Sequence, residues 1–165
     1  MKRFYTIASI ILVVALASCS TDTSQSVGFV SAEQFDGFEW HIGTDEYVDL
    51  VTDLDEAWEV YDFEKMSPFF SDTVTILTYD GLAFNSFEDF ATNIEQDPNE
   101  YQWEMVSVYS VDLNPDAGGE HVHANFAIES TNPSGEVDAY ALHEHYYIID
   151  GKIIWLHQYK REILD

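Results

Sequence analysis

Histidine is the residue type whose spacing most plainly suggests chemistry in this chain. His121 and His123 alternate in one segment, His143 and His145 alternate in a second, and His157 lies in a third. Side chains of a β-strand point alternately to opposite faces, so neighbouring strands would place these imidazoles on one face of a sheet. Three imidazoles on one face could bind zinc. Aromatic residues follow the same alternation and favour a packed surface over a metal site: Tyr147, Trp155 and Tyr159.

The only cysteine, Cys19, lies at the end of an N-terminal export signal. Lys2 and Arg3 precede an apolar run from Ile7 to Leu16, which is the pattern of a secretory signal peptide and is too short to span a membrane. The tetrapeptide that ends at Cys19, Leu-Ala-Ser-Cys, resembles the lipobox of bacterial lipoproteins. This resemblance implies that residues 1–18 are removed and that Cys19 is lipidated. The remaining chain then has no cysteine for a disulfide, a thiolate metal site or a thiol nucleophile.

The lipobox divides the chain into three parts. The resemblance implies a signal peptide over residues 1–18, a lipidated cysteine, polar tether and N-terminal extension over residues 19–43, and one domain over residues 44–165. We therefore expect a protein of the bacterial cell envelope that is anchored to the membrane by its lipid, and Ser20 favours the outer membrane. Aromatic residues predict that the extension packs onto the domain: Phe29, Phe35, Phe38 and Trp40.

The charge of the chain excludes one class of partner. Lysine and arginine together number 6, aspartate and glutamate number 31, and the formal net charge is −25. Such a surface repels nucleic acid, so we expect no nucleic-acid partner. The aromatic content of 15% argues for a folded core rather than a disordered acidic segment.

Apolar periodicity predicts helices first and long strands afterwards. Thr44, Asp62 and the sequence from Ser86 to Asp89 are predicted helix caps. The predicted helices cover 45–60, 62–70 and 86–96, and the predicted strands cover 73–79, 101–113, 120–131, 136–149 and 152–163. This order indicates the α+β class, with helices packed on a long, curved antiparallel sheet. Such a sheet would form a cone with an internal cavity.

The order and spacing of these elements resemble the nuclear transport factor 2-like superfamily, and in particular its SnoaL-like branch with the cystatin-like fold. The resemblance covers about 44–163 and rests on five stretches: 58–66 (Trp-Glu-Val-Tyr-Asp-Phe-Glu-Lys-Met), 69–75, the turn at 80–81, 86–94 and 146–153. The superfamily contains isomerases, dehydratases, epoxide hydrolases, polyketide cyclases and non-catalytic binding modules, so the fold does not select a function. Dimers formed through the sheet face are common in it. The resemblance therefore implies a homodimer through the histidine face.

Ketosteroid isomerases of this superfamily provide a residue-level comparison. The resemblance places their general base near Thr78, their oxyanion-hole tyrosine near Leu54 and their second acid at Glu144. Threonine cannot move a proton from carbon at neutral pH, and leucine cannot stabilise an enolate. We therefore do not expect that isomerase chemistry here.

The turn at Asp150-Gly151 decides which strand residues share the cavity. A type I turn with a glycine bulge would pair Ile148 with Lys152, whereas a two-residue type I′ turn would place Glu144 beside His157. The resemblance favours the first arrangement, with the even-numbered residues inward. The predicted pocket is then Leu54, Trp58, Ile76, Thr78, Asn125, Glu129, Tyr140, Leu142, Glu144, Tyr146, Leu156 and Gln158.

This pocket predicts a small, mostly apolar organic ligand held by a few polar groups, with no cofactor and no metal. If Glu144 and Glu129 are both buried, each raises the pKa of the other, and Glu144 becomes a candidate catalytic acid or base. Alternatively, Glu144 pairs with Lys160 or Gln158 at the cavity mouth, and Trp58 serves only to pack the core. A third hypothesis is an interaction module that dimerises through the sheet face.

Overall fold

The computed structural model describes residues 26–115 and 118–163. Cys19 and the signal peptide lie outside these residues. Within the described ranges the α-helices are α2 (Asp45–Trp58), α3 (Phe63–Met66) and α4 (Phe87–Glu95), and the two 3-10 helices are η1 (Glu33–Phe35) and η2 (Ser67–Phe69). The strands are β1 (Ser26–Phe29), β2 (Glu39–Ile42), β3 (Phe70–Leu77), β4 (Ala83–Phe84), β5 (Glu100–Asp112), β6 (Glu120–Thr131), β7 (Val137–Ile149) and β8 (Lys152–Glu162).

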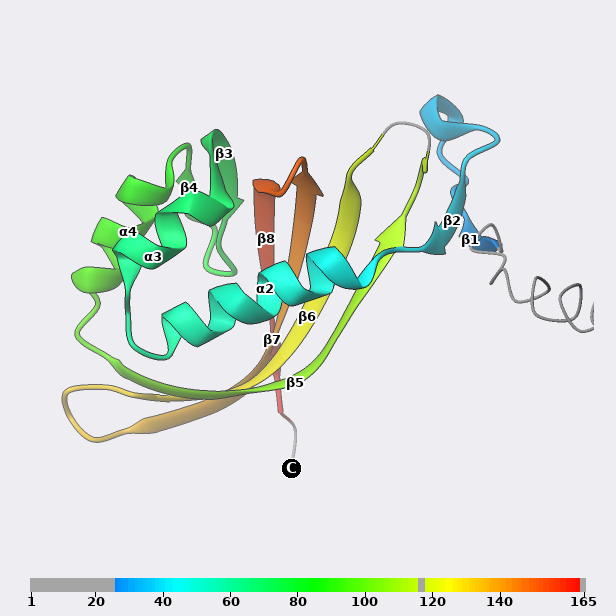
Figure 1. Ribbon diagram of the computed structural model, residues 1–165. Coiled ribbons are helices and arrows are strands. Elements are labelled where there is room, and N and C mark those ends of the chain that lie inside the picture. The colour runs from blue at the N-terminus through cyan, green and yellow to red at the C-terminus, as the bar shows by residue number, and fades with distance from the viewer. Residues whose placement is uncertain (1–25, 116–117, 164–165) are drawn as a thin grey trace, which may run out of the picture.

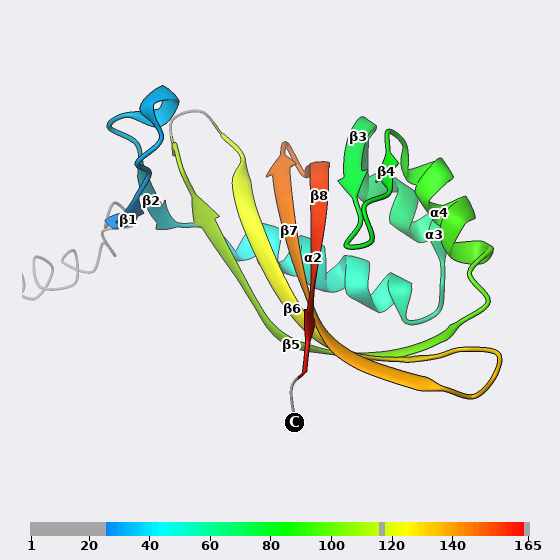
Figure 2. The same ribbon diagram turned by 180° about the vertical axis from the view of Figure 1, so that it is seen from behind.

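One curved sheet organises the molecule. The strand order is β1-β2-β5-β6-β7-β8-β3-β4, and β3 pairs with β8 in parallel while the other neighbours pair antiparallel. The helix α2 crosses one face of the sheet, and α3 and α4 lie toward its β3–β4 end (Figure 1). No helix among the described residues covers the opposite face of β5 to β8 (Figure 2). The predicted α+β class, with helices on a curved sheet, is confirmed.

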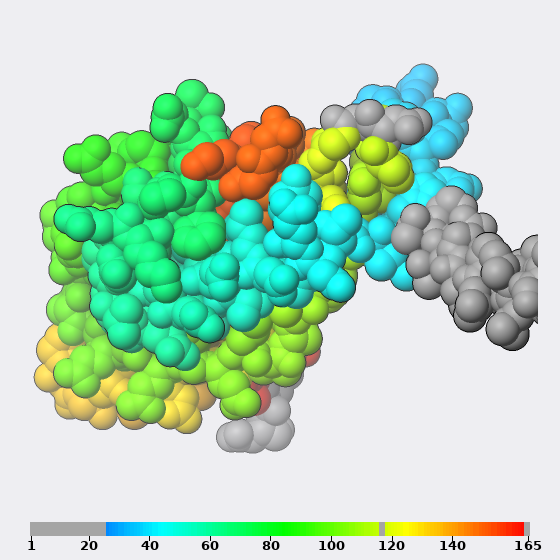
Figure 3. All heavy atoms as spheres, in the orientation of Figure 1, coloured from blue at the N-terminus to red at the C-terminus, as the bar shows by residue number. Residues whose placement is uncertain are grey.

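The helix α2 packs through an apolar stripe. Val51, Leu54 and Ala57 recur every three residues and are 1%, 1% and 0% exposed, respectively. They meet the inward side chains of the sheet, among them Val122 and Ile148, which are fully buried. A space-filling view shows α2 and α3 closely packed over the sheet, with the β1–β2 segment projecting to one side (Figure 3). Burial of this stripe is what holds α2 on the sheet.

Two of the three predicted helix caps are confirmed. The Asp62 carboxylate accepts a hydrogen bond from the Lys65 N–H at 3.0 Å, and the Ser86 hydroxyl oxygen accepts one from the Asp89 N–H at 3.1 Å. Thr44 precedes α2 as predicted, but its side chain makes no capping hydrogen bond. Instead, its N–H donates to the buried carboxylate of Glu120 at 2.7 Å.

The N-terminal extension belongs to the same sheet. β2 pairs with the end of β5 through His41 opposite Asp112 and Ile42 opposite Val111. Only Trp40 of the four aromatic residues that predicted packing contacts the histidine face, with its ring edge-on to His121 at 5.0 Å. Phe29 is 77% exposed, so the extension joins the domain mainly by backbone pairing.

Gly43 joins this extension to α2 at a point without room for a side chain. Its N–H donates to the Ser110 carbonyl at 3.0 Å, and a Cβ at this position would collide with the side chains of Ser110 and Glu120. The Ser110 hydroxyl itself donates to the Glu120 carboxylate. This buried polar contact fixes where α2 begins relative to β5 and β6.

Candidate ligand-binding cavity

The hairpin between β7 and β8 sets the face of every residue near the site. Asp150 and Gly151 both have positive φ, at 49° and 70°, and Ile149 pairs directly with Lys152. The turn therefore has two residues, and the predicted three-residue turn was wrong. However, the register shifts between Tyr147 and Ile148, because Ile154 forms a bulge in β8. This bulge returns Glu144 to a position opposite Gln158, so the predicted inward face of these two strands is correct.

A cavity of about 180 Å³ lies between the helices and the inner face of the sheet. We refer to the residues that surround it as the cavity wall. They are Asp55, Trp58, Tyr61, Thr78, Tyr79, Asp80, Leu82, Phe90, Asn93, Ile94, Asp97, Tyr101, Trp103, Phe126, Ile128, Tyr140, Leu142, Glu144, Tyr146, Leu156 and Gln158. Most of these side chains are apolar or aromatic, which is typical of sites for small organic molecules.

Eight of the residues predicted for the pocket belong to the cavity wall: Trp58, Thr78, Tyr140, Leu142, Glu144, Tyr146, Leu156 and Gln158. Leu54 and Ile76 do not, because they lie in the core at 1% and 0% exposure. Leu54 sits on the α2 stripe that faces the sheet, so the next residue, Asp55, reaches the cavity in its place. Thr78 and Leu54 stand where ketosteroid isomerases have a general base and an oxyanion-hole tyrosine, and of these two residues only Thr78 lies in the wall.

The prediction that Asn125 and Glu129 line the pocket needs correction. In the β6–β7 register Asn125 lies opposite His143 and Glu129 lies opposite Ala139. Odd-numbered residues of the two strands therefore pair with each other and share one face of the sheet. Both side chains consequently lie on the side of the sheet away from the cavity, and Phe126 and Ile128 take the inward positions. Glu129 is exposed and cannot be the second acid beside Glu144.

Glu144 is held in the wall by two hydrogen bonds. Its carboxylate accepts from the Gln158 side-chain N–H at 2.7 Å and from the Tyr146 hydroxyl. Burial raises the pKa of Glu144 above its ordinary value, while these hydrogen bonds oppose the shift and the charge of Asp55 adds to it. Of the two predicted partners, Gln158 therefore contacts Glu144, whereas Lys160 pairs with Asp138 at 2.6 Å.

Asp55 is a second carboxylate of the cavity, and it was not among the pocket residues predicted from the sequence. It accepts a hydrogen bond from the indole N–H of Trp103 at 3.0 Å, which links α2 to β5. Burial raises the pKa of Asp55, and the Trp103 hydrogen bond lowers it. Its position three residues before Trp58 was the available signal, because residues three apart share one side of a helix.

Two further carboxylates of the wall are held by hydroxyl groups. Asp97 accepts from the Tyr101 hydroxyl at 2.7 Å, and Asp80 accepts from the Thr78 hydroxyl. Burial, with the Asp97 hydrogen bond adding to it, raises the pKa of Tyr101 to about 12. This tyrosine therefore stays protonated at neutral pH and donates a hydrogen bond to Asp97.

The opposite side of the sheet carries the histidines in three rows, which we call the outer face. One row runs Tyr109, His123, His145, His157 and Leu77 across five strands. The neighbouring rows are Val111, His121, Tyr147, Trp155 and Thr75, and then Ser107, Asn125, His143 and Tyr159. The five histidines therefore lie on one face of the sheet, as the sequence predicted.

The imidazoles of the outer face contact one another in pairs. Nδ1 of His121 lies 3.0 Å from Nε2 of His145, and Nδ1 of His123 lies 3.2 Å from Nε2 of His143. Burial, with repulsion by neighbouring imidazoles, lowers the pKa of His123 to about 4 and that of His145 to about 3. These rings are neutral at pH 7. Within 26–115 and 118–163, no three histidine, cysteine, aspartate or glutamate side chains are grouped to hold a metal ion.

The described part of the chain also contains no helix that is both long and apolar enough to cross a membrane.

The fold is that of the nuclear transport factor 2-like, cystatin-like proteins, as solved structures show. An uncharacterised protein with a cystatin-like fold from Caulobacter vibrioides matches with a TM-score of 0.61 at 14% identity, over 73% of this chain and 90% of that one. An LEH-like epoxide hydrolase of M. tuberculosis matches with a TM-score of 0.58 at 13% identity, over 72% and 84%. The association domain of C. elegans CaMKII matches with a TM-score of 0.53 at 13% identity, over 70% and 93%.

No protein-family model matches the sequence, and no curated protein does. The structural matches at such low identity define the fold of this chain, and its function has to be argued from its own residues.

Proposed function

We propose that this protein binds a small, mostly apolar organic molecule in its cavity and presents that site from a lipid anchor in the bacterial cell envelope. The observation that carries the proposal is a cavity of about 180 Å³ with aromatic walls and a few hydrogen-bonded polar groups. Glu144, held by Gln158 and Tyr146, is the polar group best placed to orient a ligand. The lipobox resemblance at Cys19 supports the anchor and favours the outer membrane.

Blocking the cavity tests the binding proposal. Leu142 belongs to the wall and is 9% exposed, so Leu142→Trp should place an indole into the open space. We expect binding of an uncharged apolar probe, 4-fluorotoluene followed by fluorine NMR, to weaken at least about tenfold. Val137→Trp, on an exposed part of the same strand, is the matched control and should leave binding unchanged. Equal binding by both variants would place the probe elsewhere and contradict the proposal.

A catalytic function is the second candidate, and the environment of Glu144 favours it. A buried carboxyl group whose pKa is raised by burial is a candidate general acid or base. Glu144→Gln preserves the shape and keeps one oxygen, which can accept from Gln158, while its new NH2 group faces the Tyr146 hydroxyl oxygen. If the protein catalyses through Glu144, turnover found in a metabolite screen should fall by roughly two to four orders of magnitude. Turnover that survives the substitution unchanged would remove Glu144 from the mechanism.

We further propose that two copies associate through the outer face. The chain has 31 acidic residues, yet none of the side chains in the three rows is a carboxylate, lysine or arginine. Two strongly acidic copies repel each other everywhere except where both surfaces lack acid. The outer face is such a surface, its imidazoles are neutral, and no described helix covers it (Figure 2). Residues such as Tyr109 and Tyr159, at 49% and 54% exposure, would be buried in the dimer.

A further inference from the structure

The charged side chains of the cavity wall are all acidic. Asp55, Asp80, Asp97 and Glu144 all belong to the wall, and they come from α2, the β3–β4 turn, the segment before β5, and β7. As far as the described residues define it, the wall contains no lysine, arginine or histidine. An anionic ligand would meet these carboxylates without a cation to balance its charge, which is costly away from bulk water. The wall therefore disfavours acids and phosphates.

Aromatic rings surround the Asp55 side of the cavity at right angles to one another. The rings of Trp58 and Tyr61 lie 6.4 Å apart at 87°, and those of Tyr61 and Trp103 lie 6.2 Å apart at 89°. Trp103 also donates its indole N–H to Asp55. Each of these pairs is an edge-to-face contact, and all three rings belong to the cavity wall. Aromatic walls of this kind bind ammonium groups through the negative faces of the rings.

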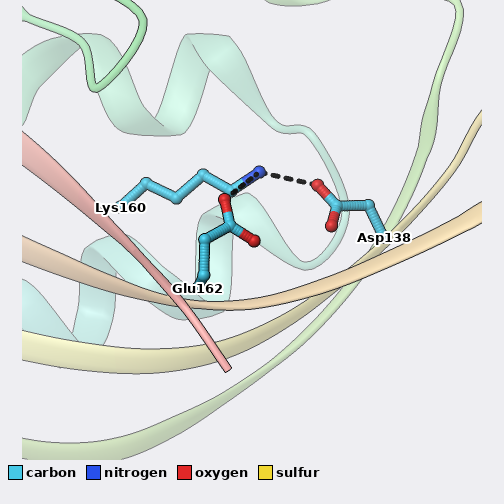
Figure 4. A network of polar contacts seen from close by, with 3 residues as sticks. All are labelled: Asp138, Lys160 and Glu162. Carbon is cyan, nitrogen blue, oxygen red and sulfur yellow. Dashed lines mark hydrogen bonds and ion pairs between the residues drawn. The ribbon is translucent and has the colours of Figure 1, made fainter. Parts of the chain in front are cut away.

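The protein already places one of its own cations against an aromatic ring of the wall. The Nζ atom of Lys160 lies 4.1 Å from the centre of the Tyr140 ring. The same ammonium pairs with Asp138 at 2.6 Å and with Glu162 at 3.8 Å, as Figure 4 shows. Its charge is thus balanced by two carboxylates that do not belong to the wall. Lys160 consequently does not neutralise Asp55 or Glu144.

We propose that the ligand of the cavity is an organic cation, an amine or quaternary ammonium compound that carries an apolar group. The apolar group would occupy the space near Phe126 and Leu156, and the cationic head would lie among the aromatic rings beside Asp55. This inference rests on the proposed function, because it assigns a ligand class to the same cavity. The strongly acidic molecule as a whole would also attract a cation toward the site.

Three probes of similar shape and different charge test the ligand class. Benzyltrimethylammonium is the cation, neopentylbenzene is its uncharged carbon analogue, and phenylmethanesulfonate is an anion with the same benzyl group. Binding to the purified protein would be measured by NMR titration at neutral pH. We expect the cation to bind about tenfold more tightly than the uncharged analogue, which corresponds to about 1.4 kcal/mol and lies within the range of cation–π contacts, and the anion not to bind.

Substitutions on α2 separate the charge from the shape of the site. Asp55→Asn keeps an oxygen that can accept from Trp103 and removes the charge, so it should weaken the cation about tenfold and change the uncharged analogue less than about twofold. Asp53→Asn removes the same charge from the exposed side of the same helix and is the matched control. It should leave binding of both probes unchanged.

The outcomes distinguish this inference from the proposed function. If the uncharged analogue binds as tightly as the cation, the cavity is a site for apolar ligands and the assignment of an organic cation is wrong. If none of the three probes binds, the proposed function and the ligand class both fail. If Asp53→Asn weakens the cation as much as Asp55→Asn does, the attraction comes from the general charge of the molecule and the assignment is again contradicted.

Discussion

Trp155→Glu is expected to convert a dimer of this protein into monomers. Trp155 lies in the middle of the outer face, with its ring 4.5 Å from that of His145 and 4.4 Å from that of His157. In a two-fold dimer each copy supplies the same surface, so the new carboxylate is buried twice among aromatic groups. Disruption of a central aromatic contact of this kind commonly costs about 2 kcal/mol or more, so the dimer should weaken at least about thirtyfold.

Light scattering at several protein concentrations measures this change. Thr92→Glu adds the same charge to an exposed position of α4 and should leave the dimer intact. Tyr159→Glu, at the more exposed edge of the outer face, provides a second disruptive variant if Trp155→Glu does not fold. A wild-type protein that is monomeric at high micromolar concentration would contradict the interface.

Cys19→Ser is expected to abolish lipid attachment completely. A thiol is required to accept the diacylglycerol in the lipobox pattern, and Cys19 is the only cysteine in the chain. Cells that express the variant should therefore accumulate an uncut, unlabelled precursor when they are grown with a radioactive fatty acid.

The matched control for this experiment is Ser18→Ala, which keeps a small residue before the cysteine and should preserve the label. Membrane fractionation of the wild type then tests the outer-membrane location. Equal labelling of the wild type and of Cys19→Ser would show that the lipid is attached elsewhere or not at all.

Much of the fold follows from local patterns. The stripe of Val51 and Leu54 predicted α2, and Ser86 with Asp89 predicted the start of α4. These signals are visible in the sequence because they depend on residues one helical turn apart. The short pairs β1–β2 and β3–β4 were missed, since β1, β2 and β4 have no more than four residues each, which is too few for a periodic pattern to show.

Local sequence patterns do not predict all of the residues that line the cavity. Alternation places Glu144 and Tyr146 on one face of β7, but it does not relate the faces of two strands to each other. That relation depends on the register, and the β6–β7 register puts Asn125 and Glu129 outside. In β8 the bulge at Ile154 changes the register in an apolar run with no glycine to mark it.

By itself, the sequence determined the helix faces, the alternation that gathers the histidines, the acidic charge and the presence of a single cysteine. Each of these depends on residue types or on contacts within one element. Only the tertiary structure decided that Asp55 and Trp103 meet across α2 and β5, that Gln158 rather than Lys160 holds Glu144, and that the cavity wall has no cation among its described residues. These contacts depend on strand register and on how a helix rests on a curved sheet, and neither is recorded in the spacing of neighbouring residues.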